Sequence, residues 1–564
     1  MVLRPKWNEW VRPLALMMLA VAASVTSLGN LFAYDSIPII RENPDVHTLA
    51  APWELFARQY WPPPFLGLYR PLSIFWFRLQ WLVGGGDPWL FHAVSMALSA
   101  VTTLVVYALG RRIFPVTVAW IAAALFAVHP VHVESVALAI NQSEIVVTLL
   151  LTASVALYLR ARQADVFSVK TAATITLFYV MACFTKEQGI VLPGLLLAAE
   201  ITVVQDRRPW RQRLPTVRLL YLILTLGASV YLFARGLVID DFIGTYTAEA
   251  LVGQSMGGRA LTMLSVVPLW LQLLFAPINQ QVDYLPQEIT TATSFGFPQL
   301  VGSLILVLAV IFAFRARKQH PATTLGILWI AVALFPVSNV LVPTGIVLAE
   351  RAMILPSVGG VLVIGSAVAW LVTRPMKSQV RVGLRVALSL ILMAGVWRSA
   401  TRTRIYHDQL TLFTQAIADS PLSYKSHFAY ADIMFQLGDN GLAERHFRIA
   451  LRLYPDYPRV YQGLADRYRL AGLCVPAIPL YLEGLARTRT THYFDLRTSL
   501  IACLLHEGRY REAAAQSRMG IAGETDVDVF RRALVTADSA GLVQAPPGTV
   551  SFRITQTDSL EDSE

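Results

Sequence analysis

The stretch that decides the fold is LALMMLAVAASVTSLGNLFAYDS, residues 14–36. Its first part, Leu14 to Ala33, is an almost uncharged run of about 20 residues, which is long enough to cross the hydrocarbon core of a bilayer. Asp35 follows directly. This order places a carboxylate at the far membrane surface, where chemistry on a lipid-linked substrate would need a base. Asp35 is therefore the first candidate catalytic residue.

Composition supports a polytopic membrane protein. The chain has 564 residues, of which 55% are hydrophobic and 15% charged, and a mean hydropathy of +0.51. A soluble protein is rarely so apolar. The net charge of +10 comes from Lys and Arg in short loops between apolar runs, where they set topology, so it indicates no nucleic-acid partner. The cysteines Cys183, Cys474 and Cys503 allow at most one bridge, Cys474–Cys503.

Apolar runs predict about eleven spans. The basic N-terminus before the first run resembles that of a signal peptide, but we expect a retained signal anchor because the run is too long. With the N-terminus cytoplasmic, about twenty basic residues fall on the inner side and about seven in the outer loops, which decides the orientation. The spans lie near residues 13–33, 90–109, 116–130, 144–160, 171–184, 189–205, 217–235, 299–314, 322–343, 352–373 and 382–398.

Two further segments are expected at the outer surface. The run 260–277 is interrupted by Pro268, and a crossing there would put the basic loops 207–218 and 315–318 on opposite sides. We therefore predict a helix in the outer half of the membrane. The outer loop 34–89 holds two aromatic-rich patterns, Pro52 to Trp61 and Tyr69 to Val83, that are typical of interfacial helices and would wall the site around Asp35.

After the last span the sequence repeats every 34 residues. Phe413, Phe447 and Tyr481 recur at this spacing, which is the helix-turn-helix period of tetratricopeptide repeats. The predicted fold is all-α, with a membrane domain over 1–400, a short repeat solenoid over 401–545 and an acidic, disordered tail over 546–564. An odd number of spans puts the repeats on the same side as Asp35, in the periplasm or lumen.

Two outer loops supply candidate carboxylates. Asp45 follows Asp35, and the next outer loop reads His129-Pro130-Val131-His132-Val133-Glu134. Asp35 and Glu134 could share one cleft, one as general base and the other orienting or stabilising; the alternative is that loop charges are simply solvated. His129 and His132 have a spacing that could hold a divalent metal, but a structural hydrogen-bonding role at a helix end is favoured.

Two outer basic residues are candidate phosphate ligands. Lys186 and Arg351 each follow an outward span and adjoin an acid, Glu187 and Glu350 respectively. A guanidinium offers a phosphate two parallel donors, whereas lysine acts as a point charge. The alternative is a structural ion pair between loops.

Together these residues resemble the transmembrane-and-tetratricopeptide O-mannosyltransferases, a branch of the GT-C membrane glycosyltransferases. The matching stretches cover the membrane region in order, and the repeats follow in the family's place. They are Tyr34-Asp35 with Asn43-Pro44-Asp45, Tyr69-Arg70-Pro71-Leu72, His129 to Glu134, Lys186-Glu187-Gln188-Gly189, Phe335-Pro336-Val337-Ser338-Asn339, and Ala349-Glu350-Arg351 followed by Leu355-Pro356-Ser357.

The resemblance implies an inverting transfer of mannose from a polyprenyl or dolichyl phosphate to Ser or Thr of an acceptor protein, on the lumenal or periplasmic face. Asp35 would be the base and Glu134 a second carboxylate. Arg351 and, second, Lys186 would bind the leaving phosphate. Asp45, His132, Glu350 and Glu187 would support them. The sequence itself requires no cofactor, and a divalent metal is a weakly supported alternative. The chain departs from the family at Ser36, where a second acid commonly follows the first, so Glu134 or Asp45 would fill that role.

Three other interpretations of the sequence differ in substrate or in protein class. The donor could carry another hexose, or the acceptor could be a glycan or a lipid. The chain could also be a non-catalytic scaffold that presents its repeats to partners, but about eleven spans exceed what anchoring needs. A transporter is disfavoured because no charge pairs lie at mid-span and no duplicated half is evident.

Overall fold

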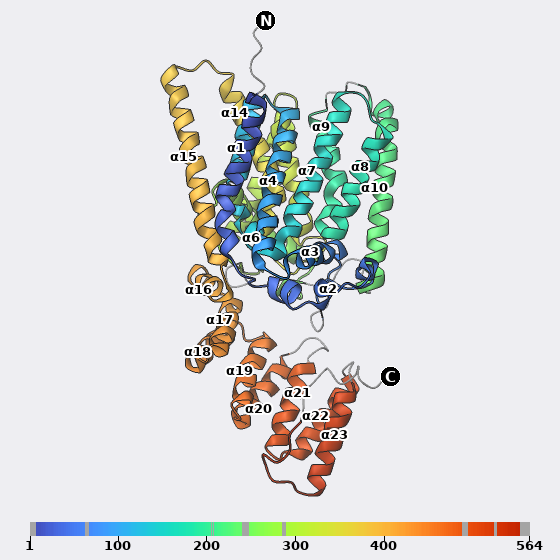
Figure 1. Ribbon diagram of the computed structural model, residues 1–564, viewed down its shortest axis with the longest axis vertical. Coiled ribbons are helices and arrows are strands. Elements are labelled where there is room, and N and C mark those ends of the chain that lie inside the picture. Colours follow the sequence, from blue (N-terminus) through green and yellow to red (C-terminus); the bar gives the residue numbers. More distant parts are fainter. Residues whose placement is uncertain are drawn as a thin grey trace. The chain divides into compact units, whose positions relative to one another are not determined.

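The structure is a computed structural model that describes residues 7–62, 67–204, 206, 208–239, 247–284, 289–487, 494–523 and 527–552. Over this part of the chain the regular elements are all helices, which confirms the predicted all-α class (Figure 1). The chain divides into two compact units, Met1–Gln415 and Ala416–Glu564. The acidic end of the expected disordered tail, Asp558 to Glu564, lies outside the described residues.

Unit 1 is a bundle of long apolar helices. Its core is built where α4, α5, α7, α9, α13 and α14 pack side by side, and Tyr158 and Trp329 are fully buried there. Its main helices are α1 (Trp7–Ser24), α4 (Pro88–Ile113), α5 (Val116–Ala127), α7 (Gln142–Gln163), α8 (Val169–Thr185), α9 (Leu192–Thr202), α10 (Trp210–Ile239), α11 (Met256–Phe275), α12 (Phe297–Ala316), α13 (Pro321–Leu334), α14 (Ile354–Val372) and α15 (Ser378–Thr403).

By length and composition, eight described helices could cross a membrane, or nine if the bent pair α5 and Pro130–Ala137 counts as one span. The sequence predicts about eleven. The difference lies mainly in three short helices, because α8, α9 and α13 have 17, 11 and 14 residues. The backbone leaves α8 at Lys186, which is extended, and Pro336 follows α13 and limits it.

Helix α11 passes the same test for a span, although the sequence predicts a surface helix there. Near its start, Arg259 Nε donates to the carbonyl of Asn339, which follows α13. At its end, the carbonyl of Leu274 lies 3.1 Å from His129 Nε2, just after α5. Both ends thus contact the same end of the bundle, as a helix lying across that end would. Its depth in a membrane stays a prediction.

The connection between α1 and α4 covers one end of unit 1 (Figure 1). It consists of η1 (Val25–Gly29), η2 (Ile37–Arg41), α2 (Pro44–His47), η3 (Pro52–Ala57) and α3 (Pro71–Gly84). Its apolar side chains form a core of their own, which includes Ile39, Phe77 and, from after α15, Tyr406. Ser73 Oγ donates to the carbonyl of Thr185. These contacts hold the segment that contains Asp35 against the helix ends.

Unit 2 is a row of helices in which each packs against the next. Gly438, Gly472 and Gly508 have positive φ at the turns of three hairpins, a backbone conformation that glycine adopts without strain. Phe447 and Tyr481 are fully buried, and a disulfide joins Cys474 to Cys503. The tetratricopeptide identity stays a prediction. The helices are α17 (Tyr424–Gln436), α18 (Asn440–Leu453), α19 (Pro458–Leu470), α20 (Cys474–Ala486), α21 (Phe494–His506), α22 (Tyr510–Gly523) and α23 (Val527–Leu542), preceded by α16 (Gln409–Asp419) at the boundary.

Candidate functional site

Asp35 follows a strained turn. Tyr34 has φ of 53°, a left-handed conformation that is uncommon for a bulky residue and recurs at functional sites. Asp35 lies two residues before η2, and its carbonyl accepts from the Ile39 amide at 3.3 Å. The neighbouring Asp35 carboxylate holds the pKa of Tyr34 well above its ordinary value. Asp35 itself is partly exposed, as a base that meets a substrate must be.

Glu134 and Arg351 form an ion pair beside Asp35. Arg351 Nη1 donates to Glu134 Oε1 at 2.5 Å, and the Arg351 amide donates to Glu134 Oε2 at 2.8 Å. Only 6% of the Glu134 side chain and 21% of the Arg351 side chain are exposed. Asp35 also interacts electrostatically with Arg351. Asp35, Glu134 and Arg351, which the sequence places in three separate segments, thus interact with one another through Arg351.

Lys186 and Glu187 form two further ion pairs at this end of unit 1. Lys186 Nζ donates to the buried carboxylate of Glu144. Burial lowers the pKa of Lys186, and the positive charges of Arg70 and Arg351 also lower it. Glu187 accepts from Arg70 at 2.8 and 3.0 Å; burial opposes ionisation, but Arg70 dominates and lowers the pKa of Glu187. Each predicted residue thus has a fixed charge partner.

Glu350 belongs to a separate buried cluster. Its carboxylate accepts from Gln280 at 2.7 Å, Arg402 at 3.1 Å and Tyr284 at 3.2 Å. Burial and the Glu350 charge raise the pKa of Tyr284 well above its ordinary value. The cluster fixes the short helix that carries Arg351, η9 (Glu350–Met353), to the end of α15. Glu350 is thus placed to support Arg351 through the backbone.

The other two predicted supporting residues, Asp45 and His132, make their described side-chain contacts outside the group formed by Asp35, Glu134 and Arg351. Asp45 pairs with Arg58, whose side chain is half exposed. His132 Nε2 lies 2.8 Å from Ser357 Oγ, and His129 uses one ring nitrogen on Leu274 and the other on the Val131 amide. Both histidines thus have hydrogen-bonding partners at a helix junction.

Within the described ranges, one group of His, Cys and carboxylate side chains is close enough to share a metal ion, namely Cys474, His506 and Glu507. The sulfur of Cys474 is bonded to Cys503 in the disulfide. The group lacks a free thiolate and has only two ligands left, so it does not fit a metal site.

Sequence reasoning missed Glu144, Arg402 and Tyr34. Glu144 lies in the first turn of α7 and Arg402 in the last turn of α15. A charge inside a membrane-length helix is costly and is seldom retained without a partner, so both could have been found by that signal. No sequence signal marks the backbone strain at Tyr34.

Comparisons with known sequences find similarity to protein mannosyltransferases. A family model described as dolichyl-phosphate-mannose-protein mannosyltransferase matches residues 69–233. A Caenorhabditis elegans protein O-mannosyl-transferase, F38B6.6, is 25% identical over 79% of this chain and 63% of its own length. Human TMTC1 is 24% identical over 78% and 55%, and mouse TMTC3 is 26% identical over 93% and 61%. The chain thus spans about 55 to 63% of the lengths of these relatives.

Solved structures give weaker likenesses. An oligosaccharyltransferase from Archaeoglobus fulgidus, tethered to an acceptor peptide, matches with a TM-score of 0.44 and 13% identity over 75% of this chain and 59% of its own. ArnT from Cupriavidus metallidurans, bound to undecaprenyl phosphate, has a TM-score of 0.38 and 13% identity over 96% and 90%. Scores below 0.5 do not establish a shared fold.

Proposed function

We propose that the chain, a relative of the TMTC-type protein O-mannosyl-transferases, is an inverting glycosyltransferase. It moves mannose or another hexose from a polyprenyl or dolichyl phosphate to Ser or Thr of an acceptor protein. The observation that supports this most is the grouping of a partly exposed carboxylate, Asp35, with a guanidinium, Arg351, that a second carboxylate holds in place. Base and phosphate ligand then lie within one site.

In the proposed step, Asp35 accepts the proton of the acceptor hydroxyl while its oxygen attacks the anomeric carbon from the face opposite the phosphate. The bond between that carbon and the phosphate oxygen breaks, and its electron pair leaves with the lipid phosphate. Configuration at the carbon is inverted. The leaving group needs no proton, but its developing charge needs cationic donors, which Arg351 and then Lys186 supply.

Glu134 and Glu144 act in this scheme as positioning carboxylates. Glu134 takes both a side-chain and a backbone donor of Arg351, so the guanidinium is oriented before substrate arrives. Glu144 does the same for Lys186. Burial lowers the pKa of Lys186, and a bound phosphate would favour its charged form. Preorganised donors of this kind cost no reorganisation during the reaction.

Chain connectivity supports a lumenal or periplasmic site. Asn30 Nδ2, just before Asp35, donates to the carbonyl of Thr403 at 3.2 Å, so the chain leaves unit 1 at the end where Asp35 lies. It then enters unit 2, which contains the Cys474–Cys503 disulfide. Disulfides persist in oxidising compartments, which favours the periplasm or lumen for this end. Unit 2 would present its helix hairpins to acceptor proteins there.

The test is transfer of radiolabelled mannose from polyprenyl-phosphate-mannose to proteins in membranes that contain the wild-type chain or Asp35→Asn. Loss of a general base lowers such rates by about 10²–10⁴-fold. Glu42→Gln is the matched control, because Glu42 lies in the same loop and pairs only with the exposed Arg41 among its described contacts.

We expect label with the wild type and Glu42→Gln and almost none with Asp35→Asn. Label that persists in Asp35→Asn would refute its role as base. No label from any variant, with expression matched, would refute mannose as the donor sugar and move the assay to other polyprenyl-phosphate hexoses.

A further inference from the structure

A large cavity lies at the other end of unit 1. It measures about 930 Å³ and is lined by the last residues of α4, α7 and α14, by the segment after α9 and by the turn between α12 and α13. At their opposite ends, α7 carries Glu144 in its first turn and α14 directly follows the short helix that contains Arg351. A cavity of this size falls within the range of small-molecule sites.

Carboxylates in and near the cavity are already neutralised. The buried Arg162 guanidinium, 1% exposed, donates to Glu200 at 2.8 Å and to Asp206 at 2.9 Å. Arg208 donates to Asp206 at 2.7 Å and to Asp165 at 2.9 Å. A third guanidinium, that of Arg213, lies 3.6 Å from Glu200 and 3.5 Å from Asp206, so three arginines balance the three acids and no excess negative charge is left to repel an anion.

Arg112 adds a cation that has no ion pair in the described part of the chain. Its backbone is fixed because Gln163 Nε2 donates to its carbonyl at 2.8 Å, and its side chain is exposed on the cavity wall. Neighbouring Arg111 instead lies over the ring of Tyr107 and does not line the cavity. The two adjacent arginines thus have different surroundings.

We propose that this cavity binds a phosphate ester through Arg112 and Arg208. Guanidinium groups pair with phosphate oxygens by two parallel hydrogen bonds. The phosphate could belong to the head group of an anionic lipid, since the cavity lies at the end of the helices where head groups are found, or to a soluble metabolite. The proposal is independent of the transferase site.

The test uses the purified full chain in nanodiscs of phosphatidylcholine with a minor fraction of phosphatidylglycerol. Native mass spectrometry after gentle release reports retained lipid. A second arm measures the shift of the thermal unfolding midpoint with glycerol 1-phosphate in pure phosphatidylcholine nanodiscs. Both arms compare the wild type, Arg112→Gln, Arg112→Lys and, as matched control, Arg111→Gln.

We expect Arg112→Gln to weaken binding about tenfold, as the loss of a charge-assisted hydrogen bond would, while Arg111→Gln leaves it unchanged and Arg112→Lys restores part of it. Retained phosphatidylglycerol identifies a lipid ligand, and a midpoint shift with glycerol 1-phosphate alone identifies a soluble one. No binding in either arm, or equal losses in Arg112→Gln and Arg111→Gln, would overturn the proposal.

Discussion

The two units of the chain are held together in different ways. In unit 1 the charged pairs join distant segments: Glu134 and Arg351 are 217 residues apart, and Arg70 and Glu187 are 117 apart. In unit 2 each helix packs on its neighbour, and the described ion pairs span far shorter stretches of chain, from four residues for Arg448 with Glu444 to 35 for Arg467 with Asp432. The site of unit 1 therefore depends on many segments at once, whereas unit 2 behaves as a sum of neighbouring contacts.

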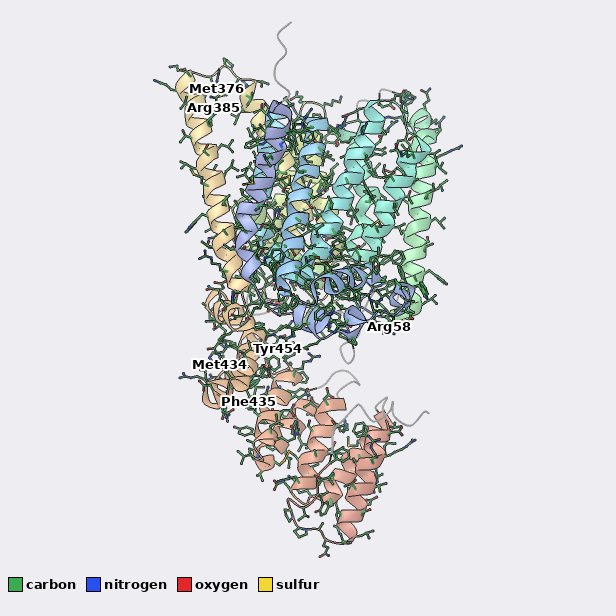
Figure 2. All side chains as sticks on the ribbon, viewed as in Figure 1. Arg58, Met376, Arg385, Met434, Phe435 and Tyr454 are labelled. Atoms are coloured by element: carbon green, nitrogen blue, oxygen red, sulfur yellow. A yellow bond between two sulfur atoms is a disulfide. The ribbon has the colours of Figure 1, made fainter. Side chains whose placement is uncertain are left out.

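This difference predicts how far the effect of a substitution extends through the chain. A change in the Asp35 region should affect both chemistry and folding, because the same pairs do both. A change in unit 2 should stay within the adjacent hairpins. Side chains throughout unit 1 and unit 2 are drawn in Figure 2.

The largest effect is expected for Arg351→Gln. Removal of one donor to a developing charge lowers a rate by about 10²–10³-fold. The same change leaves the buried Glu134 carboxylate without its partner, and breaking a buried pair costs about 3–5 kcal/mol of unfolding free energy. Mannose transfer per folded protein and thermal unfolding of the full chain measure the two losses separately.

The double variant Glu134→Gln/Arg351→Gln sharpens the comparison. It removes the uncompensated charge, so we expect most of the stability to return while transfer stays low. Arg41→Gln, a change at an exposed arginine of the same end, is the control. Full transfer by Arg351→Gln would contradict the assigned phosphate ligand.

Next in size is the loss of the disulfide by Cys474→Ala. The bridge closes a loop of 29 residues, for which loop-closure entropy gives about 3–4 kcal/mol. We expect faster hydrogen exchange in α20 and α21, with unchanged exchange in α8 of unit 1. Cys183→Ala, which removes the free buried cysteine of α8, should leave unit 2 unchanged. Faster exchange throughout unit 1 after Cys474→Ala would contradict the local behaviour of unit 2.

Local patterns explain what could be predicted from the sequence. The run 14–33 and the acid that follows it predict a helix and the place of Asp35, because length and hydropathy are properties of one segment. The 34-residue spacing of Phe447 and Tyr481 predicts buried positions one hairpin apart, and both are fully buried. The number of membrane spans was harder to predict, because α8, α9 and α13 are short.

Partners across the fold could not be predicted. Glu350 and Arg351 are adjacent, and the sequence suggests one shared role. In a 3₁₀ turn, neighbouring side chains point about 120° apart, so Glu350 turns to Arg402 while Arg351 turns to Glu134. Lys186 likewise adjoins Glu187 in sequence but pairs with Glu144. Only tertiary packing selects these partners.

A smaller effect on the free energy of unfolding is expected where helices of unit 2 pack closely. A second glycine, whose surroundings are open, serves as a control. A Cβ at Gly463 would lie 2.8 Å from Phe447 and 2.9 Å from Phe428, so Gly463→Ala should cost about 1–3 kcal/mol by overpacking. Gly441, in α18, has no neighbour closer than 3.9 Å, so Gly441→Ala should be neutral or stabilise by up to about 1 kcal/mol. Denaturant unfolding of the full chain, followed by exchange in α17 to α19, measures both. Equal effects of the two changes would argue against tight packing of α19 on its neighbours.

The smallest effect is a pH dependence confined to unit 2. His427 Nδ1 lies 2.9 Å from His446 Nδ1, and burial lowers the pKa of both rings, with the neighbouring imidazole adding to the shift at His446. Because the folded-state pKa values lie below the unfolded value of about 6.5, the unfolded state binds more protons in between. The stability that the neutral pair contributes is therefore complete above about pH 6.5 and declines as pH falls through the folded-state values. After correction for the intrinsic exchange rate at each pH, protection of the amides in α17 and α18 should fall from pH 7.5 to 5.5 more in the wild type than in His446→Gln, while α22 and α23 respond equally in both. An equal response of α17 and α18 in the two proteins would mean that the pair does not titrate on unfolding, and a response that extends to α22 and α23 would show that unit 2 unfolds as one cooperative body.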